Sequence, residues 1–181
     1  MRIIAGEKRG LRLRTMEGEE TRPTLERVKE AMFSSIQFLL PGATVLDLFA
    51  GSGQLGLEAL SRGAARCVFV DENREAVALV KENCRAVELF EKSRVLGMEA
   101  RSFLAQSKDF FDIVLLDPPF GNGVLAEILP QVELRLAPGA VVLCESEPQA
   151  VLPQQVGSIR LQRQYRYGMV MVSRYVAEKS E

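Results

Sequence analysis

The order of its apolar segments constrains the fold of this chain more than any other feature of its sequence. From about residue 43 onward, short apolar runs alternate with segments long enough to form helices. The runs are apolar throughout rather than at every second position, as a parallel strand covered on both faces requires. Because repeated strand–helix units form right-handed crossovers, the sequence predicts a Rossmann-like, doubly wound α/β fold with a mostly parallel, seven-stranded sheet.

The individual elements follow from this alternation and from the turn residues between them. The predicted strands cover residues 44–49, 67–71, 94–96, 111–117 and 140–145. The predicted helices cover residues 55–62, 74–88, 99–106 and 124–136. Near the end of the chain, segments 159–167 and 169–177 flank Gly168 and predict a hairpin, so we expect the far edge of the sheet to be antiparallel.

The first 40 residues differ from the rest in pattern and charge. Two short β-like pieces at 2–5 and 10–14 enclose turn glycines, and a helix is predicted over 24–40. We therefore expect residues 1–40 to form an N-terminal β-hairpin and helix, added to an α/β domain at 41–181. The first 14 residues hold five bases and one acid, whereas the rest of the chain carries 18 bases and 23 acids. This sorting predicts a local surface for a polyanion rather than a wholly basic protein.

Composition excludes several mechanisms. The chain of 181 residues contains no histidine, so a Ser-His-Asp site, an imidazole general base and a histidine zinc site are impossible. Cys67, Cys84 and Cys144 form no CxxC pair and lie in apolar patterns, so we interpret them as reduced core residues. Because no apolar stretch is long enough for a membrane span, we expect a cytoplasmic protein without membrane contact.

A strand that runs into a glycine-rich turn and then a helix lies at residues 45–56. Gly51 and Gly53 let the backbone approach a ligand closely, and Gly56 lets the helix pack close to the strand. Further along, Asp71 ends the next apolar strand, where a carboxylate can accept both hydroxyls of a ribose. This combination favours an adenosine-containing cofactor over a turn that is merely tight.

Asp47 helps to distinguish between cofactors that share such a loop. A carboxylate near the end of the first strand would repel a pyrophosphate, but it suits an ammonium or sulfonium group, as in S-adenosylmethionine. Alternatively, Asp47 caps the loop by accepting hydrogen bonds from its backbone amides, and the two roles can coexist.

The segment Asp117-Pro118-Pro119-Phe120 follows a buried strand, at the edge where open α/β sheets bind ligands. Its prolines remove two backbone donors and hold the turn rigid. Asp117 and the Pro118 carbonyl can accept hydrogen bonds from one planar amino group, while Phe120 can stack on a base. Methylating such an amine needs positioning and acceptors rather than a strong base. We expect a site for an exocyclic amine; the alternative is a strand-ending turn with a core phenylalanine.

These motifs together resemble class I S-adenosylmethionine-dependent methyltransferases, and residues 117–120 resemble the Asp/Asn-Pro-Pro-aromatic motif of enzymes that methylate amino groups. More narrowly, the N-terminal part is similar to the RsmD family, which methylates N2 of one guanine in small-subunit ribosomal RNA. The similar segments are RIIAG at 2–6, RG at 9–10, RPT at 22–24, RVKEAMF at 27–33 and GLEALSRGA at 56–64. The resemblance covers nearly the whole chain and implies the same reaction on 16S ribosomal RNA or a 30S assembly particle.

The resemblance also implies roles for individual residues. Those that would hold the target amine and base are Asp117, Pro118, Pro119 and Phe120. Those that would bind S-adenosyl-L-methionine are Asp47, Phe49, Gly51, Ser52, Gly53, Asp71, Met98, Glu99 and Ala100. Met98 and Glu99 should lie near the adenine ring, with Glu99 standing where the family commonly has Asp or Asn. No metal is implied, and we expect a monomer.

A further set of residues is implied to contact RNA: Arg2, Lys8, Arg9, Arg12, Arg14, Arg22 and Arg27. In this interpretation the N-terminal segment is flexible, becomes ordered on structured RNA and contacts phosphates. The alternative is a β-edge guarded by positive charge.

Three other functions stay open from the sequence. An enzyme of the same class could methylate a different amine, either N6 of adenine in DNA or a protein glutamine. A nicotinamide-dependent oxidoreductase could use the same GxGxxG loop. An assembly factor could keep the fold without catalysing any reaction.

Overall fold

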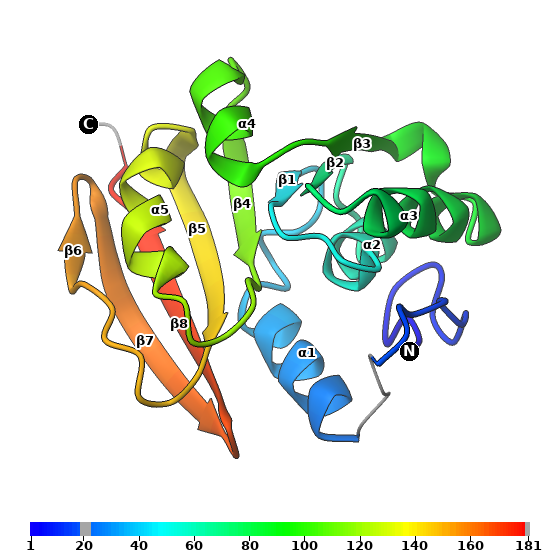
Figure 1. The fold of residues 1–181 in the computed structure, drawn as a ribbon, viewed down its shortest axis with the longest axis horizontal. Helices are drawn as coiled ribbons and strands as arrows, with labels where there is room; N and C mark the ends of the chain where they lie inside the picture. Colours follow the sequence, from blue (N-terminus) through cyan, green and yellow to red (C-terminus); the bar gives the residue numbers. More distant parts are fainter. Residues whose placement is uncertain (19–22, 180–181) are drawn as a thin grey trace.

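One eight-stranded sheet with helices on both faces dominates the computed structural model, which describes residues 1–18 and 23–179 (Figure 1). The strands are β1 (Thr44–Asp47), β2 (Arg66–Asp71), β3 (Ser93–Gly97), β4 (Phe111–Leu116), β5 (Leu136–Ser146), β6 (Gln155–Val156), β7 (Ile159–Tyr167) and β8 (Val170–Ala177). The helices are α1 (Pro23–Ser35), α2 (Gln54–Ser61), α3 (Arg74–Ala86), α4 (Ala100–Gln106) and α5 (Val124–Glu133), with a 3-10 turn at Phe90–Lys92. No helix in these described ranges is both long and apolar enough to cross a membrane.

The sheet order is β3-β2-β1-β4-β5-β8-β7-β6, with the first five strands parallel and the last three antiparallel. The predicted α/β fold class and the antiparallel C-terminal hairpin are therefore confirmed. The sheet has one strand more than predicted, because Gly157 and Ser158 form a tight reversal that pairs β6 with β7. A strand of only two residues is too short to leave a hydrophobic pattern in the sequence.

The central strands are buried on both faces, which explains why their sequences do not alternate. Val45 and Leu46 are neighbours on β1 and both are completely buried, but they contribute to different cores. One core contains side chains of α1, α2 and α3, and the other contains side chains of α4 and α5. As predicted, Cys67, Cys84 and Cys144 are free and buried.

The N-terminal hairpin is shorter than expected. Within residues 1–18, the two expected strands are reduced to a single antiparallel bridge between Arg2 and Arg12. Ile3 and Leu13 instead enter the core formed with α1, α2 and α3. The segment lies beside α2 and α3, across the molecule from β6 (Figure 1). Its backbone amides are satisfied partly by backbone carbonyls, as when Ile3 donates to Leu11, and partly by side chains of α2 and α3, so the segment needs no extended ladder.

Several predicted boundaries differ by one to three residues, and two differ by four or more. α1 ends at Ser35 rather than at residue 40, and tight turns follow it, because Pro41 disfavours a helical conformation in the residue before it. β5 begins at Leu136 rather than at residue 140. Its first residues include Pro138 and Gly139, which normally interrupt strands, and they are accommodated by an irregularity in the pairing with β4.

Gly56 is the point of closest contact between α2 and the sheet. A Cβ atom at this position would lie 2.3 Å from Phe69 Cε1 and 2.7 Å from Cys67 Sγ. We expect Gly56→Ala to lower the free energy of unfolding by about 1–3 kcal/mol, because overpacking outweighs the gain in helix propensity. Urea denaturation measures this. Gly97→Ala is the matched control, since a Cβ there would meet only Val77 at an ordinary 3.5 Å, and equal losses in the two variants would contradict the prediction.

Candidate active site

A cleft of about 1020 Å³ opens at the carboxyl ends of the parallel strands. Its walls are the loops that follow β1, β2, β3 and β4, together with Met16 and Gly18 from the N-terminal segment. Most of the predicted cofactor and amine residues line this one cleft, although they are spread over some 70 positions of the sequence. They are Phe49, Gly51, Ser52, Asp71, Met98, Glu99, Ala100, Asp117, Pro118, Pro119 and Phe120.

Asp71 joins two of these loops. One of its carboxylate oxygens accepts a hydrogen bond from the amide of Gly51 in the glycine-rich turn, at 2.9 Å. The other accepts from the amide of Asn73, also at 2.9 Å. A carboxylate oxygen can accept two hydrogen bonds, so each oxygen keeps capacity for a further donor. Asp71 therefore both shapes the turn and remains able to accept from a ligand.

The glycine-rich turn needs its glycines for conformational reasons. Gly53 precedes the first residue of α2 with a φ of 83°, in the left-handed region that side chains rarely adopt. Gly53 does not line the cleft itself. Its effect on a ligand therefore passes through the position of its neighbours Gly51 and Ser52, which do line it.

Asp47 lies beneath the turn rather than in the cleft. The side chain is 1% exposed, and its Oδ2 accepts a hydrogen bond from the Gly56 amide at 2.9 Å. Its Oδ1 is buried and has no hydrogen-bond partner among the described residues. Burial raises the pKa of Asp47 to about 7; the Gly56 amide opposes this, and the charges of Asp117 and Asp71 add to it. The structure thus shows the capping alternative for Asp47, and contact with a sulfonium stays a prediction.

Glu99 caps the start of α4. Its Oε1 accepts from the Arg101 amide at 3.0 Å, and its Oε2 accepts from the amide and hydroxyl of Ser102 at 2.9 and 3.1 Å. The hydrogen bond from the Arg101 amide is the main cause that lowers the pKa of this carboxyl. A glutamate in this place is therefore explained by the helix it caps. Its contact with an adenine ring stays a prediction.

The segment Asp117–Phe120, the expected amine site and called the amine motif below, begins directly after β4. Phe120 is 46% exposed, so the alternative of a core phenylalanine is wrong. Pro118, Pro119 and Phe120 separate the main cleft from a smaller cavity of about 100 Å³, which they also line. Phe120 is therefore available for stacking next to the acceptors that precede it.

Glu145 at the end of β5 is a residue that sequence reasoning missed. β4 and β5 pair as far as Leu116 and Cys144, so Asp117 and Glu145 follow side by side at the carboxyl edge. Burial raises the pKa of Glu145 well above its usual range, and the nearby charges of Asp117 and Asp47 act in the same direction. The signal was present, because an acid at the end of an apolar strand is the same pattern that singled out Asp71.

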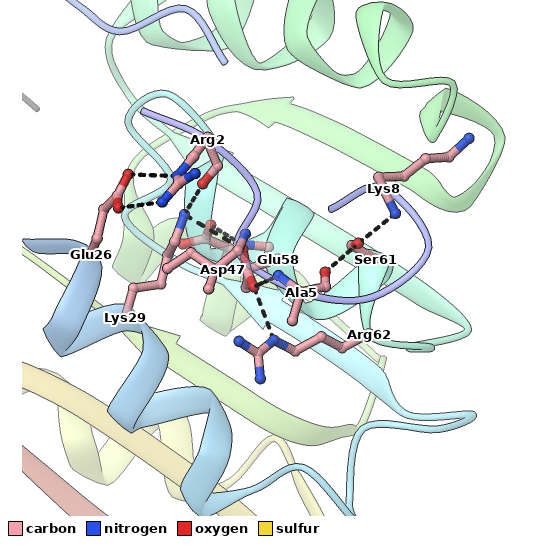
Figure 2. Close-up of polar contacts among 11 residues, drawn as sticks. Arg2, Ala5, Lys8, Glu26, Lys29, Asp47, Glu58, Ser61 and Arg62 are labelled. Atoms are coloured by element: carbon pink, nitrogen blue, oxygen red, sulfur yellow. Dashed lines mark hydrogen bonds and ion pairs between the residues drawn. The ribbon is translucent and has the colours of Figure 1, made fainter. Parts of the chain in front are cut away.

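Glu58 of α2 anchors the N-terminal segment (Figure 2). Its carboxylate accepts from the amides of Ile4 and Ala5 at 2.9 and 3.0 Å. It also forms ion pairs with Lys29 at 3.5 Å and Arg62 at 2.9 Å, while Lys29 donates to the carbonyl of Arg2 at 2.7 Å. Burial lowers the pKa of Lys29, and the charge of Glu58 opposes that effect. Because Lys29 and Glu58 are both buried, this cluster tolerates no missing partner.

Asn83 of α3 joins the same segment to the glycine-rich turn. Its Nδ2 donates to the carbonyls of both Arg14 and Ser52, and its Oδ1 accepts from the Arg14 amide, each at 2.9 Å. Asn83 is 1% exposed and lies on the helix face that carries Val80 and Cys84. A lone amide on an apolar helix face is the signal that could have revealed it. The expected flexible segment is therefore wrong: residues 1–18 are packed onto α2 and α3.

The packing of the N-terminal segment places some of the predicted RNA-binding cations in ion pairs and leaves others exposed to contact RNA. Arg2, Lys8 and Arg14 form ion pairs with Glu26, Glu88 and Glu82, at 3.2, 3.3 and 2.6 Å respectively. Three other predicted cations are exposed and have no ion pair within the described ranges: Arg9, Arg12 and Arg27. Arg22 lies outside the described residues.

The chain is similar to known proteins in both sequence and structure. Residues 1–176 match the family model described as Conserved hypothetical protein 95. The chain is 37% identical to "Ribosomal RNA small subunit methyltransferase D" of Escherichia coli strain K12, over 98% of this chain and 90% of that protein. The solved structure of yhhF from Escherichia coli is 36% identical, covers 99% of both chains and has a TM-score of 0.86.

A further solved structure is that of the T. thermophilus 16S rRNA N2 G1207 methyltransferase, RsmC, in complex with AdoMet and guanosine. It is 25% identical to this chain and has a TM-score of 0.72. The similarity covers 91% of this chain and 45% of that one.

Proposed function

The chain belongs to the family described as Conserved hypothetical protein 95, the RsmD family, and from this membership we propose that it methylates N2 of a guanine in small-subunit ribosomal RNA. The methyl donor is S-adenosylmethionine. The Escherichia coli relative supports the class of substrate, and the residues from Asp117 to Phe120 that line the cleft support an amine on a base as the target. The cytoplasm is the proposed location, because the RNA substrate is found there.

One observation carries the proposal: residues suited to a nucleoside and residues suited to an amine line the same cleft. The glycine-rich turn and Asp71 line one part of it, and the segment from Asp117 to Phe120 lines another. The first group suits a nucleoside, and the second suits an amine attached to a flat ring. An enzyme that moves a group from a nucleoside to a base amine needs both within reach of each other.

The cofactor-side residues fit S-adenosylmethionine. Each oxygen of Asp71 accepts one hydrogen bond from the protein and can accept another from a ribose hydroxyl. Gly51 and Ser52 line the cleft without a large side chain, and Met98 adds apolar surface suited to a ring. Asp47 and Asp71 make the cofactor side of this sheet edge acidic, which suits a cationic ligand better than a pyrophosphate.

The amine-side residues supply orientation and acceptors. When bound, S-adenosylmethionine supplies an electrophilic methyl group on a positively charged sulfur. The Asp117 carboxylate and the Pro118 carbonyl accept from the amino group and hold its nitrogen in line. Phe120 fixes the plane of the base by stacking. The two prolines keep these acceptors rigid, so little ordering is needed during the reaction.

Arg9, Arg12 and Arg27 are the cations proposed to contact phosphates of the RNA. They are exposed, and no ion pair in the described part of the chain neutralises them. Phosphate contacts of this kind position a nucleic acid without reading its sequence. The selection of one guanine is therefore expected to depend on the shape of the folded RNA around it.

The test is methyl transfer from isotopically labelled S-adenosylmethionine to 16S ribosomal RNA that lacks the modification. Naked RNA and assembled 30S particles serve as parallel substrates, and the nucleosides are identified by mass after digestion. We expect the label in N2-methylguanosine.

Label in N6-methyladenine, in DNA or in a protein glutamine would contradict the proposed substrate. Calorimetry with S-adenosylmethionine and NAD provides the second arm, in which binding of NAD alone would contradict methyl transfer itself. Cofactor binding without any methyl transfer would favour an assembly factor.

A further inference from the structure

Glu145 is a buried carboxyl beside Asp117 to which no role has been given so far. It is 8% exposed, and it follows Cys144, the last residue of β5 that pairs with β4, as Asp117 follows Leu116, the partner of Cys144. The two carboxyl groups lie close enough for a hydrogen bond between them, and this contact with Asp117 is one of the causes that raise the pKa of Glu145. Because an ionised carboxylate only accepts, two carboxyl groups can share a hydrogen bond only when one of them carries a proton.

The surroundings of Glu145 identify it as the protonated partner. The titratable groups that face it from neighbouring strands are Asp117 after β4 and Asp47 on β1, both acidic. On its other side, β8 places the apolar Val172 opposite it. No described cation acts on Glu145. A buried acid between acidic neighbours keeps its proton.

The smaller cavity connects Glu145 with the amine motif. This cavity of about 100 Å³ is lined by Glu145 and also by Pro118 and Phe120. Its other titratable group is Glu147, whose Oε1 accepts from the Gly121 amide at 3.1 Å and so stabilises the loop beyond Phe120. Because it lines a cavity, Glu145 can exchange its proton with solvent while staying next to the motif.

We propose that Glu145, in its protonated form, is a positioning residue that donates a hydrogen bond to Asp117 and holds this carboxylate in place to accept from the target amine. The inference rests on the proposed function, because it concerns the same amine site. The pair then carries one negative charge, and the Asp117 carboxylate, whose oxygens can each accept more than one hydrogen bond, can still accept from the amine. When Glu145 ionises, the donor is lost and two like charges stand side by side, so Asp117 loses its fixed position.

Two substitutions separate this role from simple packing. Glu145→Gln keeps a donor to Asp117 and has no titrating proton, whereas Glu145→Ala removes the donor. With saturating cofactor and unmodified 30S particles, we expect Ala to lower kcat about 10- to 100-fold, the effect of losing one hydrogen bond to a charged group. Gln should retain most of the wild-type kcat. Glu178→Gln is the matched control, because Glu178 is an exposed surface residue paired with Arg160.

The pH profile gives the decisive readout. Burial and its acidic neighbours raise the pKa of Glu145, so wild-type kcat should fall as pH rises through that pKa. The Gln variant should lack this alkaline limb, and the Glu178→Gln control should keep it. Infrared spectroscopy of the free enzyme, without cofactor and above the pKa of about 7 at which Asp47 ionises, should show a protonated carboxyl band that disappears at higher pH and is missing in Glu145→Gln.

Three results would overturn the inference: equal losses of kcat in Gln and Ala, an alkaline limb unchanged in Gln, or no loss in either variant. Unfolding midpoints and cofactor affinities of all variants show whether a loss reflects misfolding. If the wild-type enzyme fails to form N2-methylguanosine, the proposed function has failed instead, and the infrared band still reports whether Glu145 holds the proton.

Discussion

Replacing Asp117 with alanine should lower kcat for methyl transfer by about 10²- to 10³-fold and leave the affinity for S-adenosylmethionine nearly unchanged. The side chain is the one carboxylate of the Asp-Pro-Pro-Phe segment, and it follows β4 at the cleft wall. The turn on the cofactor side is instead held by Asp71, through hydrogen bonds that the substitution does not touch. Single-turnover transfer of labelled methyl groups and calorimetry of cofactor binding measure the two effects separately.

Asp117→Asn is the informative companion variant. An asparagine keeps a carbonyl acceptor of the same length, and we expect it to retain part of the activity that alanine loses. Full methylation by the alanine variant would contradict the role given to this carboxylate. Loss of cofactor affinity in step with kcat would instead make Asp117 a cofactor residue.

Deleting residues 1–14 should destabilise the whole protein and weaken cofactor binding as well as RNA binding. The deletion removes Ile3 and Leu13 from the core, each worth about 2–5 kcal/mol when such a side chain is truncated. It also takes the Ile4 and Ala5 amides away from the buried Glu58, and Arg14 away from Asn83. Urea denaturation and calorimetry with S-adenosylmethionine measure the outcome.

A matched variant removes charge from the same segment without touching its packing. Arg9→Ala combined with Arg12→Ala should leave the unfolding free energy and cofactor affinity unchanged, because both side chains are exposed. RNA binding by this double variant should weaken and depend less steeply on salt. If the deletion behaves like the double variant, with stability and cofactor affinity intact, the segment is an independent arm and its observed packing is not needed.

The α/β body could be predicted because its strands are buried on both faces. Neighbours such as Val45 and Leu46 serve opposite cores, so the strand reads as a continuous apolar run that is hard to confuse with a helix face. The N-terminal segment could not be predicted in this way. Its backbone partners are Glu58 and Asn83, more than 50 positions away, and no local pattern reports such a pairing.

The candidate site shows the same division. Asp71 and Asp117 were recognisable because each ends an apolar strand, and parallel strands end at one edge. Glu145 met the same criterion, because it ends the apolar run predicted as a strand over residues 140–145, but it was given no role. Met16 and Gly18 line the cleft because Asn83 of α3 donates a hydrogen bond to the carbonyl of Arg14, just before them. This contact joins residues far apart in the sequence, so no local pattern predicts it.

The anchoring of the N-terminal segment also sets an order of events during synthesis. Ile3 and Leu13 are synthesised before Glu58 and Asn83, which hold the backbone amides of the neighbouring Ile4 and Arg14 and follow them by more than 50 residues. At about 5–20 residues per second, the segment must wait for several seconds as an unpaired, partly apolar chain flanked by positive charge. The folding of residues 1–18 therefore depends on α2 and α3, and translation that stalls before α3 leaves a nascent chain that cannot close the cleft.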